Sequence, residues 1–442
     1  MNSTEVIHLP RNMPNRKVVS QAVATDYTFI KKLIWAYFLL LLFEGALRKW
    51  FLPELSQGLL IIRDPIVIWI YFLAHRENIL PLENIYIKNL LLFTLVFGFI
   101  SFFFAGTHWA TVGYGIRTNL LHFPLLFIMG KVLNQKDVII FGKAIMILAL
   151  PMTFIVAEQF QADRDDIINV GAGGNGFQLE TSGGKVRASG TFSFVSGIVF
   201  FYCFTIAFVI HGFITQNLYK RFYPYLGAGA TLLAMVTAGS RAVIADCLQV
   251  VGCFGFLAYY KPSEFGRITA SIFGISAVAI FLYYQIDLFQ EGIEFLSLRF
   301  EEAANVEGNP IEAYFNRYVE LIMVPYHNFK FELIGNGLGS ATRAGAVFGG
   351  YSWSENSWRR AFMEGGFFFG SAFILWRLWI TKDLLKSCIQ SLKQNNYLPI
   401  FLFGATGPIL LFGILGQPTN LGFAAFGGGL CLASMKTKKG NS

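Results

Sequence analysis

The polar side chains best suited to chemistry lie in one short stretch, directly before an apolar segment. They are Glu355, Asn356, Arg359, Arg360 and Glu364. Charges at the edge of a membrane span are costly and are usually retained for function. A carboxylate at such a place could act as a general base, and arginines could hold phosphate oxygens. We therefore interpret this stretch as one wall of a site for a negatively charged substrate.

The composition indicates which kind of fold must hold this site. Of the 442 residues, 54% are hydrophobic and 14% are charged, whereas a soluble chain would carry about a quarter charged residues. Many apolar runs approach the roughly 20 residues that cross a bilayer as a helix. A membrane β-barrel would instead show alternating strands of about ten residues. The sequence predicts an all-α polytopic membrane protein.

Hydropathy predicts about twelve transmembrane helices. They cover residues 33–47, 58–74, 89–106, 118–133, 138–157, 191–211, 223–239, 242–260, 268–286, 361–379, 398–416 and 420–435. The chain then divides into a cytosolic N-terminal lead (1–32), transmembrane helices 1–9 (33–286), a large periplasmic loop (287–360), transmembrane helices 10–12 (361–435) and a cytosolic tail (436–442). A smaller periplasmic loop covers about 158–190.

The basic residues predict the orientation. Lysine-rich segments alternate regularly with the others along the chain and are predicted to be cytosolic, near Lys31, Lys131, Lys220, Lys261, Lys382 and Lys436. This pattern, together with anionic lipid, also accounts for the net charge of +8 without nucleic-acid binding. The opposite segments carry mostly arginines, whose planar fork suits phosphate. They favour an anion site on the periplasmic side of a bacterial inner membrane. Each could instead only anchor a span at lipid headgroups.

The large loop has a pattern of its own. Apolar residues recur at helical spacing over 311–322, which predicts an amphipathic helix that contains Arg317 and ends at Pro325. Gly335 and Gly337 follow, and they predict a backbone that turns tightly or approaches a ligand closely.

Four segments, in this order, resemble a known family. They are Val186–Phe192, Ser240-Arg241-Ala242, Arg299 or Arg317 followed by Ile334–Gly339, and Glu355-Asn356 with Glu364 and Gly366. Over roughly residues 187–370 the chain resembles the O-antigen ligase and O-antigen polymerase family of bacterial polysaccharide-assembly membrane glycosyltransferases. Two departures stand out. Glu355 occupies the place of the ligase histidine, which favours a polymerase, and Ser193–Ser196 replaces the usual Asn-Pro.

The resemblance implies a fold of about twelve helices with the large periplasmic loop packed over a periplasm-facing cavity. The substrate would be a glycan on undecaprenyl pyrophosphate, polymerised as O-antigen or exopolysaccharide repeat units. A ligase that transfers glycan to lipid A core or protein, and a flippase for lipid-linked oligosaccharide, are the alternatives. Partners would be membrane lipid and other polysaccharide-assembly proteins, such as a chain-length regulator, with no nucleic acid.

Residue roles follow from this chemistry. Arginines would bind the pyrophosphate and stabilise its charge as the glycosidic bond breaks; they are Arg187, Arg241, Arg299 and Arg317, with Arg117 ranked below them. Glu355 would act as the base, with Arg241 and Arg317 as further catalytic residues. Gly335, Gly337 and Asn356 would shape the loop. Because pyrophosphate is a good leaving group, we predict no metal and no cofactor.

Purely structural interpretations compete with these roles. Glu355 could pair with Arg359, and Glu364 with Arg360, because each pair has i,i+4 spacing. The neighbours Arg63-Asp64 are expected to form an internal ion pair, and Arg48-Lys49 an interfacial anchor. The five cysteines show neither metal-ligand spacing nor a disulfide framework.

Overall fold

A computed structural model describes residues 27–436, apart from positions 175, 182, 216–217, 308, 310–311, 313–314, 317–318, 321 and 324–331. Arg317 and most of the predicted amphipathic helix therefore lie outside the described residues. Within the described residues the fold is all-α, as predicted, with isolated bridges Val170–Phe177 and Glu180–Val186 in place of a sheet.

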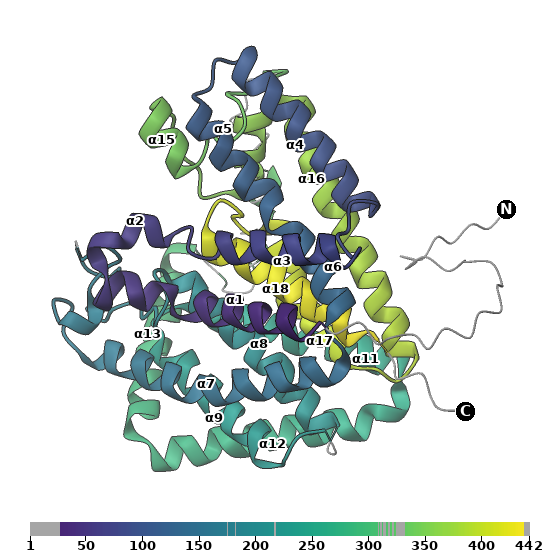
Figure 1. Ribbon diagram of the computed structural model, residues 1–442. Coiled ribbons are helices and arrows are strands. Elements are labelled where there is room, and N and C mark those ends of the chain that lie inside the picture. The colour runs from purple at the N-terminus through teal and green to yellow at the C-terminus, as the bar shows by residue number, and fades with distance from the viewer. Residues whose placement is uncertain are drawn as a thin grey trace, which may run out of the picture.

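The helices follow one another through the whole described chain (Figure 1). The first half contains α1 (Thr28–Ala46), a π-helical turn (Leu47–Phe51), α2 (Ser56–Leu59), α3 (Asp64–Arg76), α4 (Ile85–Phe103), α5 (Trp109–Ile116), a second π-helical turn (Arg117–Leu121), α6 (Phe123–Val132) and α7 (Gln135–Gln161). The second half contains α8 (Val195–Ile214), α9 (Phe222–Thr237), α10 (Arg241–Gly252), α11 (Phe254–Tyr260), α12 (Phe265–Gln285), α13 (Asp287–Glu307), α15 (Arg343–Gly349), α16 (Ser357–Lys393), α17 (Leu398–Phe412) and α18 (Pro418–Ser434). Each of the twelve predicted segments overlaps a helix.

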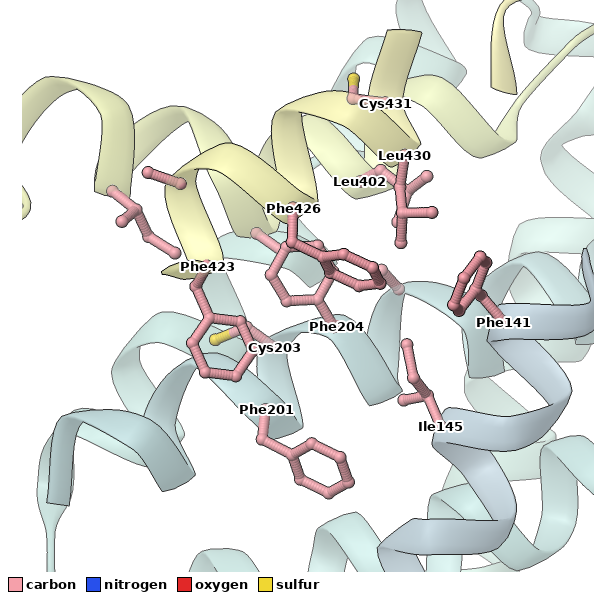
Figure 2. Close-up of a cluster of buried hydrophobic side chains, with 14 of the residues drawn as sticks. Phe141, Ile145, Phe201, Cys203, Phe204, Leu402, Phe423, Phe426, Leu430 and Cys431 are labelled. Carbon is pink, nitrogen blue, oxygen red and sulfur yellow. The ribbon is translucent and has the colours of Figure 1, made fainter. Parts of the chain in front are cut away.

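Helix α8 lies at the centre of the bundle. The most apolar 18-residue stretch of this helix is 89% buried, and the helices that pack around it are α7, α9, α10, α17 and α18. Figure 2 shows Phe201 and Phe204 of α8 among Phe141 of α7 and Phe423 and Phe426 of α18. The ring centroids of Phe204 and Phe423 are 5.8 Å apart. This core of interlocking aromatic rings holds together helices that are distant in sequence.

Six helical stretches of the described chain are long and apolar enough to cross a membrane: Pro53–Arg76, Ile85–Phe103, Gln135–Gln161, Val195–Ile214, Arg241–Tyr260 and Pro262–Gln285. The last is only 17% buried and exposes Phe273 and Phe281, as expected for a lipid-facing helix. The chain is thus a helical membrane protein. Of the other predicted spans, 223–239 and 398–416 fall on the shorter apolar helices α9 and α17, whereas 361–379 falls within the 37-residue α16. The number twelve therefore stays a prediction.

The predicted large loop is partly helical. It contains α13 and α15, and α16 begins at Ser357, before the predicted start of its span at 361. Helix α16 is 37 residues long and is broken at Gly366, whose φ of 60° and ψ of −158° are not helical. The break is possible because glycine has no Cβ to clash in this conformation.

The two ends of the bundle differ chemically. At one end, which we call the Lys31 end, Lys31 Nζ lies 2.7 Å from Asp137 of α7, and Lys436 Nζ donates to the carbonyl of Lys131 at 2.6 Å. At the opposite end, the Arg48 end, Arg63 donates to the carbonyl of Pro418 at 2.6 Å. Lysines predicted to share a side therefore do lie together. Which side of a membrane each end faces remains a prediction.

Gly427 of α18 tests the close packing on α8. A Cβ at this position would clash with the ring of Phe204 and would lie 2.6 Å from Thr406 Oγ1. Gly427→Ala should therefore destabilise the protein by about 1–3 kcal/mol, the usual cost of overpacking a core. Thermal unfolding in detergent measures the change. Gly255→Ala, where a Cβ meets nothing within 4 Å, is the control and should be neutral or stabilising. Equal stability of the two variants would contradict the packing.

Candidate functional site

Two segments of the resemblance lie side by side at the Arg48 end. The amide of Ala188 donates to the carbonyl of Ala238 at 3.2 Å. Gly239 has a φ of +63°, and a Cβ there would lie 2.9 Å from the carbonyl oxygen of Val186. The backbone of Arg187 therefore runs against the turn that leads into Arg241, the first residue of α10. Two predicted phosphate ligands thus come from adjacent backbones.

Helix α13 packs over this region as well. Gly292 packs against Val236 of α9, and the ring of Phe295 lies 5.4 Å from that of Phe160. Arg299 follows Phe295 by one helical turn, which places both on the same face of α13. Its side chain is only 13% exposed and lies 3.2 Å from Glu302. Arg299 is therefore held on the covered side of α13, which packs over the segment before Arg187.

Arg48 and Lys49 are not interfacial anchors, as the sequence suggested, but are buried at 6% and 2% exposure. Arg48 donates to Ser193 Oγ at 2.8 Å and to the carbonyl of Ser56 at 2.9 Å. Lys49 donates to Ser189 Oγ at 3.1 Å and also to the carbonyl of Gly190. Both cations thus hold the turn that precedes α8.

Local structure explains why two successive cations are buried. Residues Leu47–Phe51 form a π-helical turn at the end of α1. Such turns are uncommon and occur often at functional sites. The sequence feature that could have indicated this burial is Glu44, a carboxylate within an apolar run and one helical turn before Arg48. Glu44 is itself buried and lies 3.6 Å from Arg48.

The predicted Arg63–Asp64 ion pair is wrong. Arg63 Nε lies 3.2 Å from Glu44. Asp64 instead accepts hydrogen bonds from Nε and Nη2 of Arg117, the latter at 3.0 Å, and its Oδ1 lies 3.0 Å from His122 Nε2. The two neighbours separate because the side chain of Asp64, at the start of α3, meets Arg117 and His122, which lie between α5 and α6.

The same contacts revise the role of Arg117. The Asp64 carboxylate accepts from Nε and Nη2 of the Arg117 guanidinium, and Nη2 also donates to the carbonyl of Leu60 at 3.0 Å. Arg117 is thus engaged in an internal ion pair, and no contact joins it to Arg187 or Arg241 in the described part of the chain. A role for Arg117 as a phosphate ligand stays a prediction.

The predicted Arg360–Glu364 pair is confirmed. Arg360 Nε lies 2.7 Å from Glu364 Oε1, and both residues are buried. Arg360 also donates to Thr118 Oγ1 at 3.3 Å, next to Arg117. A small cavity of about 20 Å³ lies beside them, which is room for about one water molecule.

Arg377 was not singled out from the sequence. It is 1% exposed and donates to the carbonyls of Leu410 at 2.7 Å and Gly413 at 2.9 Å, and to Ser357 Oγ. Among the described residues no carboxylate pairs with it. Its charge is thus met only by neutral oxygens from α17 and from the start of α16.

The buried charge at the Arg48 end does not balance. Six cations lie in this buried region: Arg48, Lys49, Arg63, Arg117, Arg360 and Arg377. Three carboxylates face them: Glu44, Asp64 and Glu364. Six minus three leaves an excess of three positive charges when Lys49 is protonated and of two when it is neutral, because burial lowers the pKa of Lys49 to about 7. Because buried charges are normally paired, the excess produces a positive potential that favours an anion at this end.

Glu355, the predicted base, is exposed. Among the described residues its carboxylate makes no hydrogen bond or ion pair, including with Arg359. Asn356 caps α16, because its Oδ1 accepts from the amides of Trp358 at 3.0 Å and Arg359 at 2.9 Å. The competing ion-pair interpretation is thus not seen, and the catalytic role of Glu355 stays a prediction.

The glycine loop fits into the break of α16. The amides of Asn336 and Gly337 donate to the carbonyls of Met363 and Glu364, both at 2.9 Å. A Cβ at Gly335 would lie 2.6 Å from the amide nitrogen of Gly366, and Gly337 has a φ of +95°. The close approach predicted at Gly335 and Gly337 is therefore correct, but it is made to another helix. The loop satisfies the carbonyls that the break leaves open.

Removing one partner of the buried Arg360–Glu364 pair should cost far more stability than removing one partner of an exposed pair. Glu364→Gln would leave a buried guanidinium without its counter-charge, at a cost of about 3–5 kcal/mol. Glu180→Gln, which removes the exposed partner of Arg164, should cost less than about 1 kcal/mol. Thermal unfolding of both variants in detergent compares them. Similar losses of stability in the two variants would contradict a larger structural role for the buried pair.

Lys49 should give stability a distinct pH dependence. Burial lowers the pKa of Lys49 to about 7, against about 10.4 in an unfolded chain. Between these values the unfolded state binds the extra proton, so stability rises with pH across this window. Relative to Lys49→Met, the wild type should therefore gain unfolding temperature from pH 7 to pH 9.5. If the difference in unfolding temperature between the two proteins does not change with pH, Lys49 stays protonated over this range, bonded to the carbonyl of Gly190.

A comparison with models of known protein families found no match for this sequence, and a comparison with curated proteins found none either. A functional proposal for the chain therefore rests on its residues and on the geometry described above.

Proposed function

We propose that this protein is an inner-membrane glycosyltransferase that polymerises undecaprenyl-pyrophosphate-linked oligosaccharide units, as an O-antigen or exopolysaccharide polymerase does. The Arg48 end would face the periplasm and hold the active site. One observation carries the proposal: buried cations exceed buried carboxylates at the same end where the segments of Arg187 and Arg241 lie side by side. An anionic diphosphate matches that excess.

In this proposal the sugar carbon forms a bond to the acceptor hydroxyl oxygen while its bond to the diphosphate oxygen breaks. The electron pair leaves with undecaprenyl pyrophosphate. Arg187, Arg241 and Arg299 stabilise the developing charge, together with Arg317. Arg48 and Lys49 act on the site through the backbone of residues 189–193, so they are positioning residues. Glu355, exposed at the start of α16, accepts the proton of the acceptor hydroxyl.

A ligase would share this donor chemistry and differ in its acceptor. A flippase for the same lipid-linked units is the second candidate, and a specific observation favours it. Asp64, His122 and Tyr37 form a buried chain, with Tyr37 Oη 2.9 Å from His122 Nδ1. Such intramembrane ionisable chains occur in proton-coupled transporters.

Replacing the clamp arginines tests the enzyme. Arg187→Ala and Arg241→Ala should each lower polymer formation from defined undecaprenyl-pyrophosphate glycan by about 10²-fold, the usual effect of removing one charge-stabilising donor. Purified protein and gel analysis of chain length provide the measurement. Arg267→Ala is the control, because Arg267 is 60% exposed and pairs only with Glu264. Its activity should stay at the wild-type level.

Full activity of both clamp variants at normal protein levels would refute the clamp. The alternatives give different products. A deletion strain that makes single-repeat glycans indicates a polymerase, whereas accumulated lipid-linked polymer indicates a ligase. Movement of labelled lipid-linked sugar across liposomes without new glycosidic bonds would indicate the flippase.

A further inference from the structure

The small cavity beside the break in α16 joins several separate parts of the chain. Its volume is about 20 Å³. Figure 1 shows α4, α5 and α16, which surround it, beside one another. The lining residues come from α16 on both sides of Gly366, from α4 (Phe93 and Phe97), from the second π-helical turn (Asn119) and from the segment after the glycine loop (Leu338). A ligand in this cavity would therefore contact all of these parts at once.

The charges that line the cavity do not balance. Arg360 and Arg377 are cations, and Glu364 is the one carboxylate among the described lining residues. Two minus one leaves a net charge of +1. Carbonyls at the end of α17 meet Arg377, but a helix C-terminus supplies only about half a negative charge. A positive potential therefore remains at the cavity, and it is strong because these three side chains are buried in a low dielectric.

Hydrogen-bond donors at the cavity also lack acceptors. Asn119 is only 4% exposed, and its side-chain amide makes no hydrogen bond within the described part of the chain. Arg360 donates from Nε to Glu364 and from Nη2 to Thr118, whereas its Nη1 donates to none of the described residues. Buried donors are nearly always paired. The ligand of this cavity is therefore one that accepts hydrogen bonds.

We propose that the cavity binds one small monovalent anion, a halide such as chloride, which accepts from Asn119 and Arg360. The space is sufficient for about one water-sized species, and a halide ion is only slightly larger, whereas phosphate and carboxylate ligands are too large. A water molecule would leave the net positive charge uncompensated, which is costly in the interior. The ion holds the second π-helical turn to both halves of α16. This inference does not depend on the proposed function.

Exchanging the anion tests the site in the intact protein. Thermal unfolding of the detergent-purified chain is measured in sodium chloride, sodium bromide and sodium gluconate at equal ionic strength, because gluconate is too large for the cavity. The unfolding temperature should rise by about 1–2 °C for each tenfold increase in chloride or bromide above its Kd. It should not rise with gluconate. Equal unfolding temperatures in chloride and gluconate would overturn the proposal, because a water molecule would then fill the cavity.

Substitutions at Asn119 separate binding from a general effect of salt. Asn119→Asp places a fixed negative charge at the cavity, so this variant should be as stable in gluconate as the wild type is in chloride. Asn119→Leu keeps a similar side-chain size, and both variants should lose the response to chloride. Asn395→Asp, at an exposed position, is the matched control and should respond as the wild type does. An undiminished response in both Asn119 variants would overturn the site.

Bromide locates the ion without any substitution. Crystals of the wild type grown in bromide, with diffraction recorded at the bromine absorption edge, should give an anomalous peak beside the side-chain amide of Asn119, between Arg360 and Arg377. Anomalous peaks only at exposed cations, with none in the cavity, would overturn the proposal.

Discussion

Two buried cations at the end of α1 fix the geometry of the entire Arg48 end. Arg48 and Lys49 donate to the turn at residues 189–193, which leads into the central helix α8. Just before this turn, the backbone of Arg187 packs against the segment that leads into Arg241. A further hydrogen bond, from Thr191 Oγ1 to the carbonyl of Leu42 in α1 at 2.6 Å, holds the same turn. The interaction is strong because it is shielded from water, and it is specific because neutral oxygens, placed at defined distances, meet both charges.

Different interactions join the helices at the polar end and in the apolar middle of the bundle. In the middle, aromatic rings of α7, α8 and α18 interlock (Figure 2), and the described ion pairs lie elsewhere. At the Arg48 end, helices meet through guanidinium groups that bind backbone carbonyls, as Arg63 does at Pro418 and Arg377 at Leu410. Burying these cations is costly in a low dielectric. Glu44 offsets the charge of Arg63, whereas Arg377 meets no carboxylate in the described part of the chain. Burying Arg377 therefore adds positive potential at this end of the bundle.

The sequence predicted what depends on local spacing. The helical segments follow from hydrophobic runs, and the Arg360–Glu364 pair follows from i,i+4 spacing within α16. It could not predict partners that are remote along the chain. Asp64 meets Arg117, 53 positions away, and Arg48 meets Ser193, 145 positions away. A span-end pair such as Arg48-Lys49 looks the same in sequence whether it points to lipid headgroups or into the bundle. Only the fold of α1 against the 189–193 turn decides between them.

The break in α16 has a consequence for how this chain tolerates changes in length. A straight helix transmits any insertion to all later residues, because each added residue turns the remainder by about 100°. At Gly366 the helical hydrogen bonds are interrupted, and the loop at 335–337 takes over the open carbonyls. The half that carries Arg360 and the half that carries Arg377 are therefore joined without continuous helical geometry at Gly366, and Arg377 links them by donating to Ser357 Oγ. Homologous chains could gain or lose a residue at this joint while both arginines keep their partners, whereas the same change a few residues further on would turn Arg377 away from α17.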